Sequence, residues 1–180
     1  NTRHENAAYL PGITLPESLS ATTDLAAGLA GAEAILFVIP AQYARENLAR
    51  MRDLTGGAAL PVALCCKGIE RGTGAMMTDV IAEAWPEAIP AILSGPSFAA
   101  DVARGLPTAV TLACSNYDTG ARWLATVSAP HFRPYLSADM IGTELGGAVK
   151  NVLAIACGII EGKGFGESAK AALMARGFAE

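Results

Sequence analysis

The run Ala34-Ile35-Leu36-Phe37-Val38-Ile39 is continuously apolar and lies between Gly31 and Pro40. A run of this length with such boundaries is typical of a strand that is buried on both faces of a parallel sheet. The segment from Gln42 to Leu54 follows it and is amphipathic, which predicts a helix. A buried strand followed by a helix is the repeating unit of an α/β domain.

Strand and helix signals continue to alternate on both sides of this unit. We predict further strands at 60–65, 89–93, 108–113 and 131–136, and further helices at 24–30, 73–85 and 118–127. This alternation indicates an α/β domain of the doubly wound, Rossmann-like class with parallel strands, which we assign to residues 1–137. Residues 1–23 are expected to be irregular, and Thr23 or Asp24 can cap the helix that follows. Ligands of such folds bind at the carboxyl ends of the strands.

The pattern changes at Ser137, because no strand signal follows it. Residues 138–161 have helical periodicity and 167–180 also look helical, which predicts the start of an all-helical domain at 138–180. Lys150, Asn151 and Gly158 interrupt the apolar part of the first helix, so we expect no membrane span. The chain begins without Met and stops inside a predicted helix, so we expect it to be an internal fragment of a longer protein.

Composition and charge exclude some classes of function. The 180 residues are 52% hydrophobic and carry a net charge of −4, without a basic stripe that would bind nucleic acid. The chain has four cysteines and two histidines but no CxxC pair, so we expect no metal site. Reduced, buried thiols in a cytoplasmic protein are the simplest interpretation of the cysteines.

The first candidate site residue is Lys67, in the segment Cys65-Cys66-Lys67-Gly68-Ile69-Glu70. A lysine directly after an apolar strand lies at the carboxyl edge of the sheet, where Gly68 lets the chain turn sharply. The ammonium group can there pair with a phosphate or a carboxylate. Alternatively, the side chain simply extends past the strand end into solvent.

The second candidate is the segment Leu93-Ser94-Gly95-Pro96-Ser97-Phe98-Ala99, which follows the next predicted strand. Gly95 permits close approach of the backbone, and Ser97 offers a hydroxyl group. If a helix begins there, its first N–H groups point into the crevice and can bind an anion. The other interpretation is an ordinary strand–helix turn with Ser97 as the cap. The segment is not a GxSxG elbow, so a Ser-His hydrolase is not expected.

The third candidate is Lys150, in the segment Glu144-Leu145-Gly146-Gly147-Ala148-Val149-Lys150-Asn151. The paired glycines weaken the helix by roughly 1 kcal/mol each relative to Ala, which suggests close packing or ligand approach. Val149 and Val152 flank the lysine and predict its partial desolvation, which favours the neutral amine needed for general acid–base work. A helix lysine that reaches solvent is the alternative.

These segments, together with several others, have a joint order and spacing that resemble one family. The others are Asn6-Ala7-Ala8-Tyr9-Leu10-Pro11, Val38-Ile39-Pro40, Gly105-Leu106-Pro107-Thr108-Ala109, Gly164-Phe165-Gly166 and Lys170-Ala171-Ala172-Leu173. From end to end, the chain resembles the bacterial NAD(P)-dependent glycerol-3-phosphate dehydrogenases. Each segment alone is weak evidence, but their combination is specific.

The resemblance implies an enzyme that moves a hydride reversibly between NAD(P)H and glycerone phosphate, giving sn-glycerol 3-phosphate for phospholipid synthesis. By position, Lys150 matches the catalytic proton donor or acceptor, which also contacts the substrate. Lys67 matches a contact to both substrate and cofactor, Gly95 and Ser97 match substrate contacts, and Ala99 matches a cofactor contact. The family also implies a cytoplasmic enzyme that prefers NADPH, with a homodimer as a common state.

Some parts of the family pattern are absent from these residues. The Gly-rich dinucleotide loop is expected before Asn1, and an Asp with a Ser-Arg-Asn phosphate-binding cluster after Glu180, so we expect the 180 residues alone to be inactive. Two other readings remain. One is a related reductase of the 6-phosphogluconate-dehydrogenase superfamily, such as a ketopantoate reductase, and the other is a non-catalytic nucleotide-binding module.

Overall fold

A five-stranded sheet forms the centre of the computed structural model, which describes residues 4–179. In the described part, the elements are β1 (Glu5–Asn6), β2 (Leu10–Thr14), α1 (Leu25–Leu29), β3 (Ile35–Phe37), the 3-10 helix η1 (Ala41–Tyr43), α2 (Ala44–Leu54), β4 (Pro61–Leu64), α3 (Met77–Ala84), β5 (Ile89–Ser94), α4 (Ala99–Ala103), β6 (Thr108–Ala113), α5 (Tyr117–Val127), β7 (Phe132–Ser137), α6 (Met140–Gly162) and α7 (Glu167–Ala179). Each predicted strand of the sheet is present, which confirms the alternating α/β pattern.

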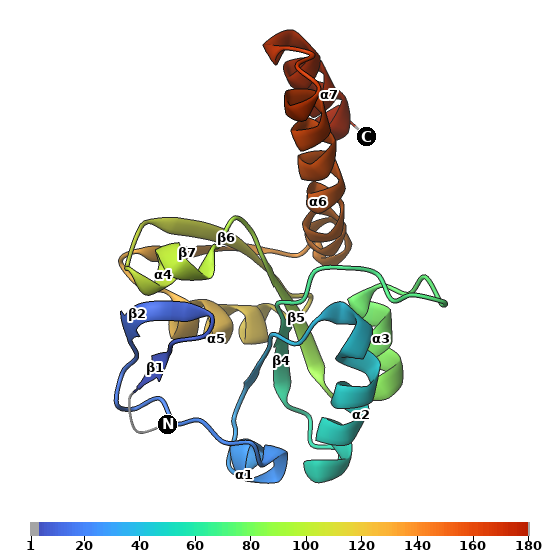
Figure 1. Cartoon of the computed structure of the whole chain (residues 1–180). Helices are drawn as coiled ribbons and strands as arrows, with labels where there is room; N and C mark the ends of the chain where they lie inside the picture. Colours follow the sequence, from blue (N-terminus) through green and yellow to red (C-terminus); the bar gives the residue numbers. More distant parts are fainter. Residues whose placement is uncertain (1–3, 180) are drawn as a thin grey trace.

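The sheet has the order β3-β4-β5-β6-β7 and is mixed. Strands β3, β4 and β5 are parallel, and β6 and β7 are parallel to each other, but β6 runs antiparallel to β5. The prediction of parallel strands throughout was therefore wrong at this pair. The connection from β5 to β6 contains only the five-residue α4, which contacts β2 (Figure 1) and does not carry the chain across a face of the sheet.

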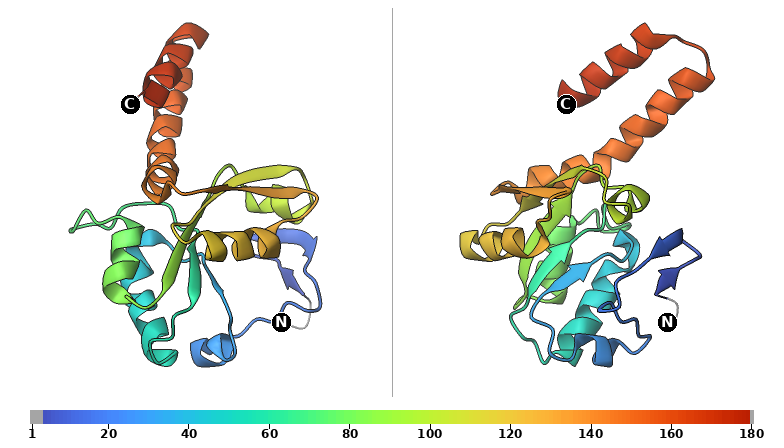
Figure 2. Two further views of the ribbon diagram at one scale, coloured as in Figure 1. Left: turned by 180° about the vertical axis from the view of Figure 1, so that it is seen from behind. Right: turned by 90° about the vertical axis from the view of Figure 1, so that its left-hand side faces the viewer.

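Helices cover both faces of the sheet, as a doubly wound fold requires (Figures 1 and 2). Helices α2 and α3 pack on one face, where Leu48 and Trp85 join the strand residue Phe37 in the larger apolar core. Helix α5 lies on the other face, where Trp123 packs with Leu112 in a smaller core. Fully burying such side chains stabilises the fold by about 1.5–3 kcal/mol each, so the two cores hold the strand ends in place.

Strand β3, which contains the apolar run from Ile35 to Phe37, lies at the edge of the described sheet. Ile35 and Phe37 are buried as predicted, whereas Leu36 and Val38 are 51% and 70% exposed. Burial on both faces was therefore wrong for this strand. Among the described elements, β3 has β4 as its only neighbour in the sheet, and its second face is left open.

The first residues also differ from expectation. Residues 1–3 lie outside the described part, and the segment beyond them forms the antiparallel hairpin β1–β2 instead of an irregular stretch. The backbone N–H of Gly12 donates to the side chain of Glu5 across the hairpin at 3.1 Å. The prediction of a cap at Asp24 is confirmed, because its carboxylate accepts from the N–H groups of Ala26 and Ala27.

Helix α6 starts against the sheet and then extends away from it, paired with α7 (Figures 1 and 2). By length and composition α6 is apolar enough to cross a membrane. The interruption by Lys150 therefore does not by itself exclude a membrane span, contrary to the argument from the sequence. Its first half, however, contacts β5 and α3 and holds the buried carboxylate of Glu144. Carboxylates are rare in hydrocarbon, and the absence of a membrane span stays a prediction.

Candidate active site

Lys67 lies at the carboxyl edge of the sheet, in the loop after β4. Its Nζ atom donates a hydrogen bond to the carbonyl oxygen of Gly95, in the loop after β5, at 3.1 Å. Because β4 and β5 are parallel neighbours, the loops that follow them emerge at the same edge. Lys67 is half-buried and does not extend freely into solvent, so the structure brings together two residues that the sequence predicted for the site.

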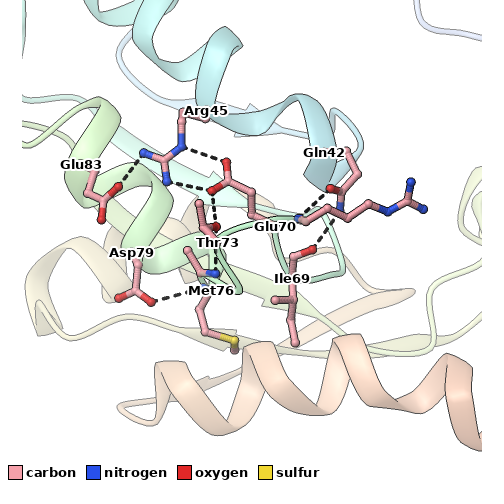
Figure 3. Close-up of polar contacts among 10 residues, drawn as sticks. Gln42, Arg45, Ile69, Glu70, Thr73, Met76, Asp79 and Glu83 are labelled. Carbon is pink, nitrogen blue, oxygen red and sulfur yellow. Dashed lines mark hydrogen bonds and ion pairs between the residues drawn. The ribbon is translucent and has the colours of Figure 1, made fainter.

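The loop that carries Lys67 is attached to α2 by a cluster of charged side chains (Figure 3). The guanidinium of Arg45 donates to both carboxylate oxygens of Glu70 at 2.9 Å, and also to Glu83 on α3 at 2.6 Å. The hydroxyl group of Thr73 donates to Glu70 at 2.6 Å. The Arg45 hydrogen bonds are the largest cause that lowers the pKa of Glu70 to about 2, so this carboxylate is ionised at neutral pH.

A second attachment involves Gln42, whose amide group bridges two backbone positions of the same loop (Figure 3). Its Nε2 donates to the carbonyl of Ile69 at 2.8 Å, and its Oε1 accepts from the N–H of Arg71 at 2.9 Å. Helix α3 begins only at Met77, so the predicted start of that helix at 73 was wrong. The loop is thus held at several points beyond Lys67.

Gly95 is constrained by its neighbour in the sheet. Its φ is +157°, and a Cβ atom there would lie 2.9 Å from the Cα of Val110 on β6. A side chain is excluded because β6 returns directly beside β5, so the backbone of this loop can approach closely. The carbonyl oxygen of Gly95 accepts the hydrogen bond from Lys67 at this position.

Ser97 lies in the same loop and Ala99 is the first residue of α4, and both are exposed. The alternative interpretation, in which Ser97 caps a helix, is wrong, because α4 begins at Ala99 with Phe98 in the capping position and no side-chain cap bond. The hydroxyl of Ser97 instead donates to the carbonyl of Gly95 at 3.4 Å. Ser97 therefore shares an acceptor with Lys67, whereas Ala99 shows no contact with either predicted lysine.

Helix α6 reaches the site through Gly147, which is buried. A Cβ atom at Gly147 would lie 2.6 Å from the hydroxyl oxygen of Ser94 and 3.7 Å from the Cγ of Lys67. The absence of a side chain therefore lets α6 approach the end of β5. The neighbouring Gly146 meets no atom within 4 Å, so only one glycine of the pair serves close packing.

Lys150 is three residues beyond Gly147 and lies across the junction from Lys67. Its Nζ atom is 5.9 Å from the centroid of the Phe98 ring. Burial, followed by the positive charge of Lys150, lowers the pKa of Lys67, so the two ammonium groups are close enough to interact. The predicted desolvation of Lys150 is not found, since its side chain is exposed in the described structure.

Three features of the site escaped the sequence interpretation. The Arg45–Glu70 contact joins residues 25 positions apart, and no local pattern indicated it. The same holds for Glu144, which bonds to α3 over 66 positions. Phe98 follows Ser97 and precedes Ala99 in the sequence, so its position between two predicted site residues could have indicated that it belongs to the site.

The cysteines close to the site are unreactive. All four cysteines are free, and burial raises the pKa of both Cys65 and Cys66 to about 11. Their thiols therefore stay protonated at neutral pH and are poor nucleophiles. The lysines are the groups at this edge that can transfer a proton or bind an anion.

The carboxyl edge of the sheet also exposes apolar side chains, against which an aromatic ring of a ligand could pack. Phe98 and Val38 are each 70% exposed and lie in the segments that follow β5 and β3. Apolar walls with a few polar groups are typical of cofactor sites, and Lys67 supplies a polar group. Ala99, the first residue of α4, follows Phe98 directly at this edge.

Comparisons with known proteins show which family the chain belongs to. The family described as NAD-dependent glycerol-3-phosphate dehydrogenase matches residues 1–120 with its N-terminal part and 139–180 with its C-terminal part. A glycerol-3-phosphate dehydrogenase (NAD(P)+) of Parvibaculum lavamentivorans is 57% identical over 100% of this chain and 54% of its own length. The chain thus spans about half the length of the curated relatives that it matches.

Solved structures give the same result. Glycerol-3-phosphate dehydrogenase from Coxiella burnetii is 40% identical, with a TM-score of 0.93 over 99% of this chain and 54% of its own. The enzyme from Saccharomyces cerevisiae is 30% identical, with a TM-score of 0.85 over 99% of this chain and 53% of its own.

The fold and the junction define a class, in which a Rossmann-like sheet meets a helical domain and each side provides a lysine. Within that class, the chain belongs to the NAD-dependent glycerol-3-phosphate dehydrogenase family.

Proposed function

We propose that the protein containing this chain is an NAD(P)-dependent sn-glycerol-3-phosphate dehydrogenase. It interconverts glycerone phosphate and sn-glycerol 3-phosphate and so provides a precursor for phospholipid synthesis. The observation that carries this proposal is the meeting of Lys67, Gly95 and Lys150 at the junction of the sheet and α6. Family membership supplies the reaction to which this arrangement fits.

Charge at the junction favours a phosphorylated substrate. Burial, followed by the positive charge of Lys150, lowers the pKa of Lys67, so the two ammonium groups lie close enough together to attract an anion. Gly95 accepts one of the three N–H donors of Lys67, which leaves donors for a substrate oxygen. The exposed hydroxyl of Ser97 lies in the same loop and offers a further hydrogen bond to the substrate.

Lys150 is proposed as the catalytic residue at the C2 oxygen of the substrate. In the direction of reduction, its ammonium group stabilises the alkoxide that develops and then donates the proton. In the direction of oxidation, the neutral amine accepts the hydroxyl proton. The ring of Phe98 beside Nζ restricts the positions of Lys150 and attracts its positive charge.

Lys67 and Ala99 are proposed to contact the cofactor, with Phe98 providing apolar surface for its ring. NAD(P)H, when bound, supplies the hydride, and NADPH is the form that we expect to be preferred. The Lys67 ammonium orients the substrate carbonyl toward the cofactor from the sheet side, while Lys150 serves the opposite side of the junction.

The proposal extends to the setting of the enzyme. Four free cysteines suit a reducing cytoplasm. Helix α6 exposes several apolar side chains, among them Val152, Ile155 and Ile159. We propose that a homodimer interface buries part of this apolar surface. Light scattering of the purified protein tests the dimer, and a monomer at working concentration contradicts it.

The reaction is tested by following the consumption of NADPH and of NADH with glycerone phosphate. Ketopantoate and 6-phosphogluconate serve as controls with NADPH and NADP+ respectively. We expect the full-length protein to turn over glycerone phosphate and neither of the two control compounds. Turnover of a control compound instead identifies another reductase of the superfamily, and cofactor binding without any turnover identifies a non-catalytic module.

A further inference from the structure

Glu144 is a buried carboxylate that connects the helical segment to the sheet domain. Its side chain belongs to α6, and the residue is 3% exposed. One carboxylate oxygen accepts from the backbone N–H of Met77, and both accept from the N–H of Thr78, at 3.3 and 3.4 Å. The hydroxyl of Thr78 adds a bond of 2.9 Å. All of these donors lie in the first turn of α3.

The first turn of α3 is a suitable place for a carboxylate. The first N–H groups of a helix have no partner within the helix, and its dipole favours negative charge there. The side chain of Asp79 in α3 accepts from the N–H of Met76, which leaves those of Met77 and Thr78 for Glu144. Burial of a carboxylate is unfavourable unless it is paired in this way. The contact is therefore specific in position and in orientation.

The same side of α6 carries the residues that reach the site. Glu144, Gly147 and Lys150 follow each other at intervals of three, which places them in a stripe along one side of the helix. Gly147 packs against Ser94 and Lys67, and Lys150 lies beside Phe98. Lys150 is roughly 9 Å further along the axis than Glu144, at 1.5 Å per residue. A rotation or shift of α6 at Glu144 thus displaces Lys150.

We propose that Glu144 is a positioning residue, which binds the first turn of α3 and so holds α6 in the rotation that sets Lys150 opposite Lys67. The role rests on the proposed dehydrogenase function. Glu144 touches neither substrate nor cofactor and acts through Lys150. It is distinct from a residue that only stabilises the fold, because its loss affects the proton-transfer step more than cofactor binding.

The test uses the full-length enzyme and two substitutions of Glu144. Glu144→Leu keeps the size but removes the acceptors, whereas Glu144→Gln keeps an acceptor for the N–H groups of α3. We expect Glu144→Leu to lower kcat by about 100-fold, the effect of a displacement near 1 Å, with the KM for NADPH unchanged. Glu144→Gln restores most of kcat.

Asp139→Ala is the matched control, because Asp139 caps the same helix through the N–H of Gly142 at 2.8 Å but has no partner on α3. It is expected to lower the melting temperature and leave kcat unchanged. A folded Glu144→Leu enzyme with the kcat of the wild type overturns the positioning role. So does a loss of kcat in Asp139→Ala that equals the loss in Glu144→Leu.

Two further outcomes remain decisive. If Glu144→Leu does not fold, Thr78→Val removes the hydroxyl donor alone, and we expect a smaller fall in kcat at constant KM for NADPH. Two results together overturn the proposal in that case. They are an unchanged kcat in Thr78→Val and a folded Glu144→Gln enzyme without measurable activity. A wild-type enzyme that does not turn over glycerone phosphate refutes the proposed function itself and is thereby distinguished from a failure of the positioning role.

Discussion

Individual residues of α6 have different tasks although they are close in the chain. Gly146 and Gly147 look equivalent in the sequence, yet only Gly147 faces the end of β5. Lys150, one turn further, presents its ammonium to Phe98 and to the charge of Lys67. The side on which each residue lies decides its role, because α6 meets the sheet along a single stripe.

The two glycines permit a direct comparison. Gly146→Ala is expected to stabilise the protein by about 1 kcal/mol, because alanine favours the helix and meets no neighbour. Gly147→Ala places a Cβ atom 2.6 Å from the hydroxyl of Ser94. The overpacking offsets the helical gain, so this variant should be less stable than Gly146→Ala by about 1–3 kcal/mol. Chemical denaturation of both variants measures the difference, and equal stabilities contradict the packing.

Lys150→Ala is the residue-scale test of the proposed chemistry. We expect kcat to fall by about 100-fold or more, the lower range for loss of general acid–base catalysis, while NADPH binding persists. Lys163→Ala is the control, since Lys163 lies at the exposed end of the same helix. Steady-state kinetics and cofactor titration measure both effects. A Lys150→Ala enzyme with normal kcat rules out the assigned role.

At the scale of elements, the loop after β4 depends on two helices for its position. Arg45 on α2 holds Glu70 of the loop, and it also contacts Glu83 on α3. The Glu70 side chain is 13% exposed, whereas that of Glu83 is 63% exposed. Exposed ion pairs contribute little, so of the two pairs of Arg45 the bidentate one with Glu70 contributes more to holding the loop that carries Lys67.

This pair predicts a dependence of stability on pH. The pKa of Glu70 is lowered from 4.5 to about 2 by the hydrogen bonds from Arg45, followed by that from Thr73. Because the pKa of Glu70 in the folded state lies below its ordinary value, the ionised carboxylate stabilises the folded protein fully above about pH 4.5. This contribution to the free energy of unfolding is lost as the pH falls toward 2. The unfolding free energies of wild type and Glu70→Gln should therefore converge over that range.

Denaturation at several pH values measures this convergence. Glu83→Gln is the control, and its stability should stay close to that of the wild type at every pH, because that carboxylate is exposed. A constant difference between wild type and Glu70→Gln down to pH 2 is incompatible with the assigned pair.

At the scale of the whole molecule, the proposed site lies where two units meet. The sheet domain provides Lys67 and Gly95, and α6 provides Lys150. Neither unit alone holds both of these lysines. The junction is held by the Glu144 contact to α3 and by the close approach at Gly147.

The coupling between the two units is measurable as a pKa. Burial is the largest cause that lowers the pKa of Lys67, and the positive charge of Lys150 lowers it further. Lys150→Ala should therefore raise the pKa of Lys67, which stays below its ordinary value because the burial remains. NMR titration of isotope-labelled lysine side chains gives the value, and the chain has only four lysines to assign. Lys170→Ala is the control, because Lys170 pairs with Glu161 further along α6. An unchanged Lys67 pKa in Lys150→Ala contradicts the facing arrangement.

Much of the fold was predictable from local patterns. Apolar runs bounded by Gly and Pro located the strands, and amphipathic spacing located α2 and α5, because burial and periodicity are written in neighbouring residues. The reversal of direction at β6 was not predictable, since an apolar run has the same pattern in either direction. The hairpin β1–β2 was also missed, because its pairing does not depend on a buried face.

For the site, the sequence by itself determined that Lys67 and Gly95 lie at one edge, because both follow neighbouring parallel strands. It also placed Lys150 in a helix beyond the sheet. Only the tertiary structure decided that Lys150 faces Lys67, that Gly147 is the glycine in contact, and that Glu144 holds the junction. These facts depend on the rotation of α6 against α3 and β5. That rotation is set by contacts over 66 positions of chain, which no local pattern encodes.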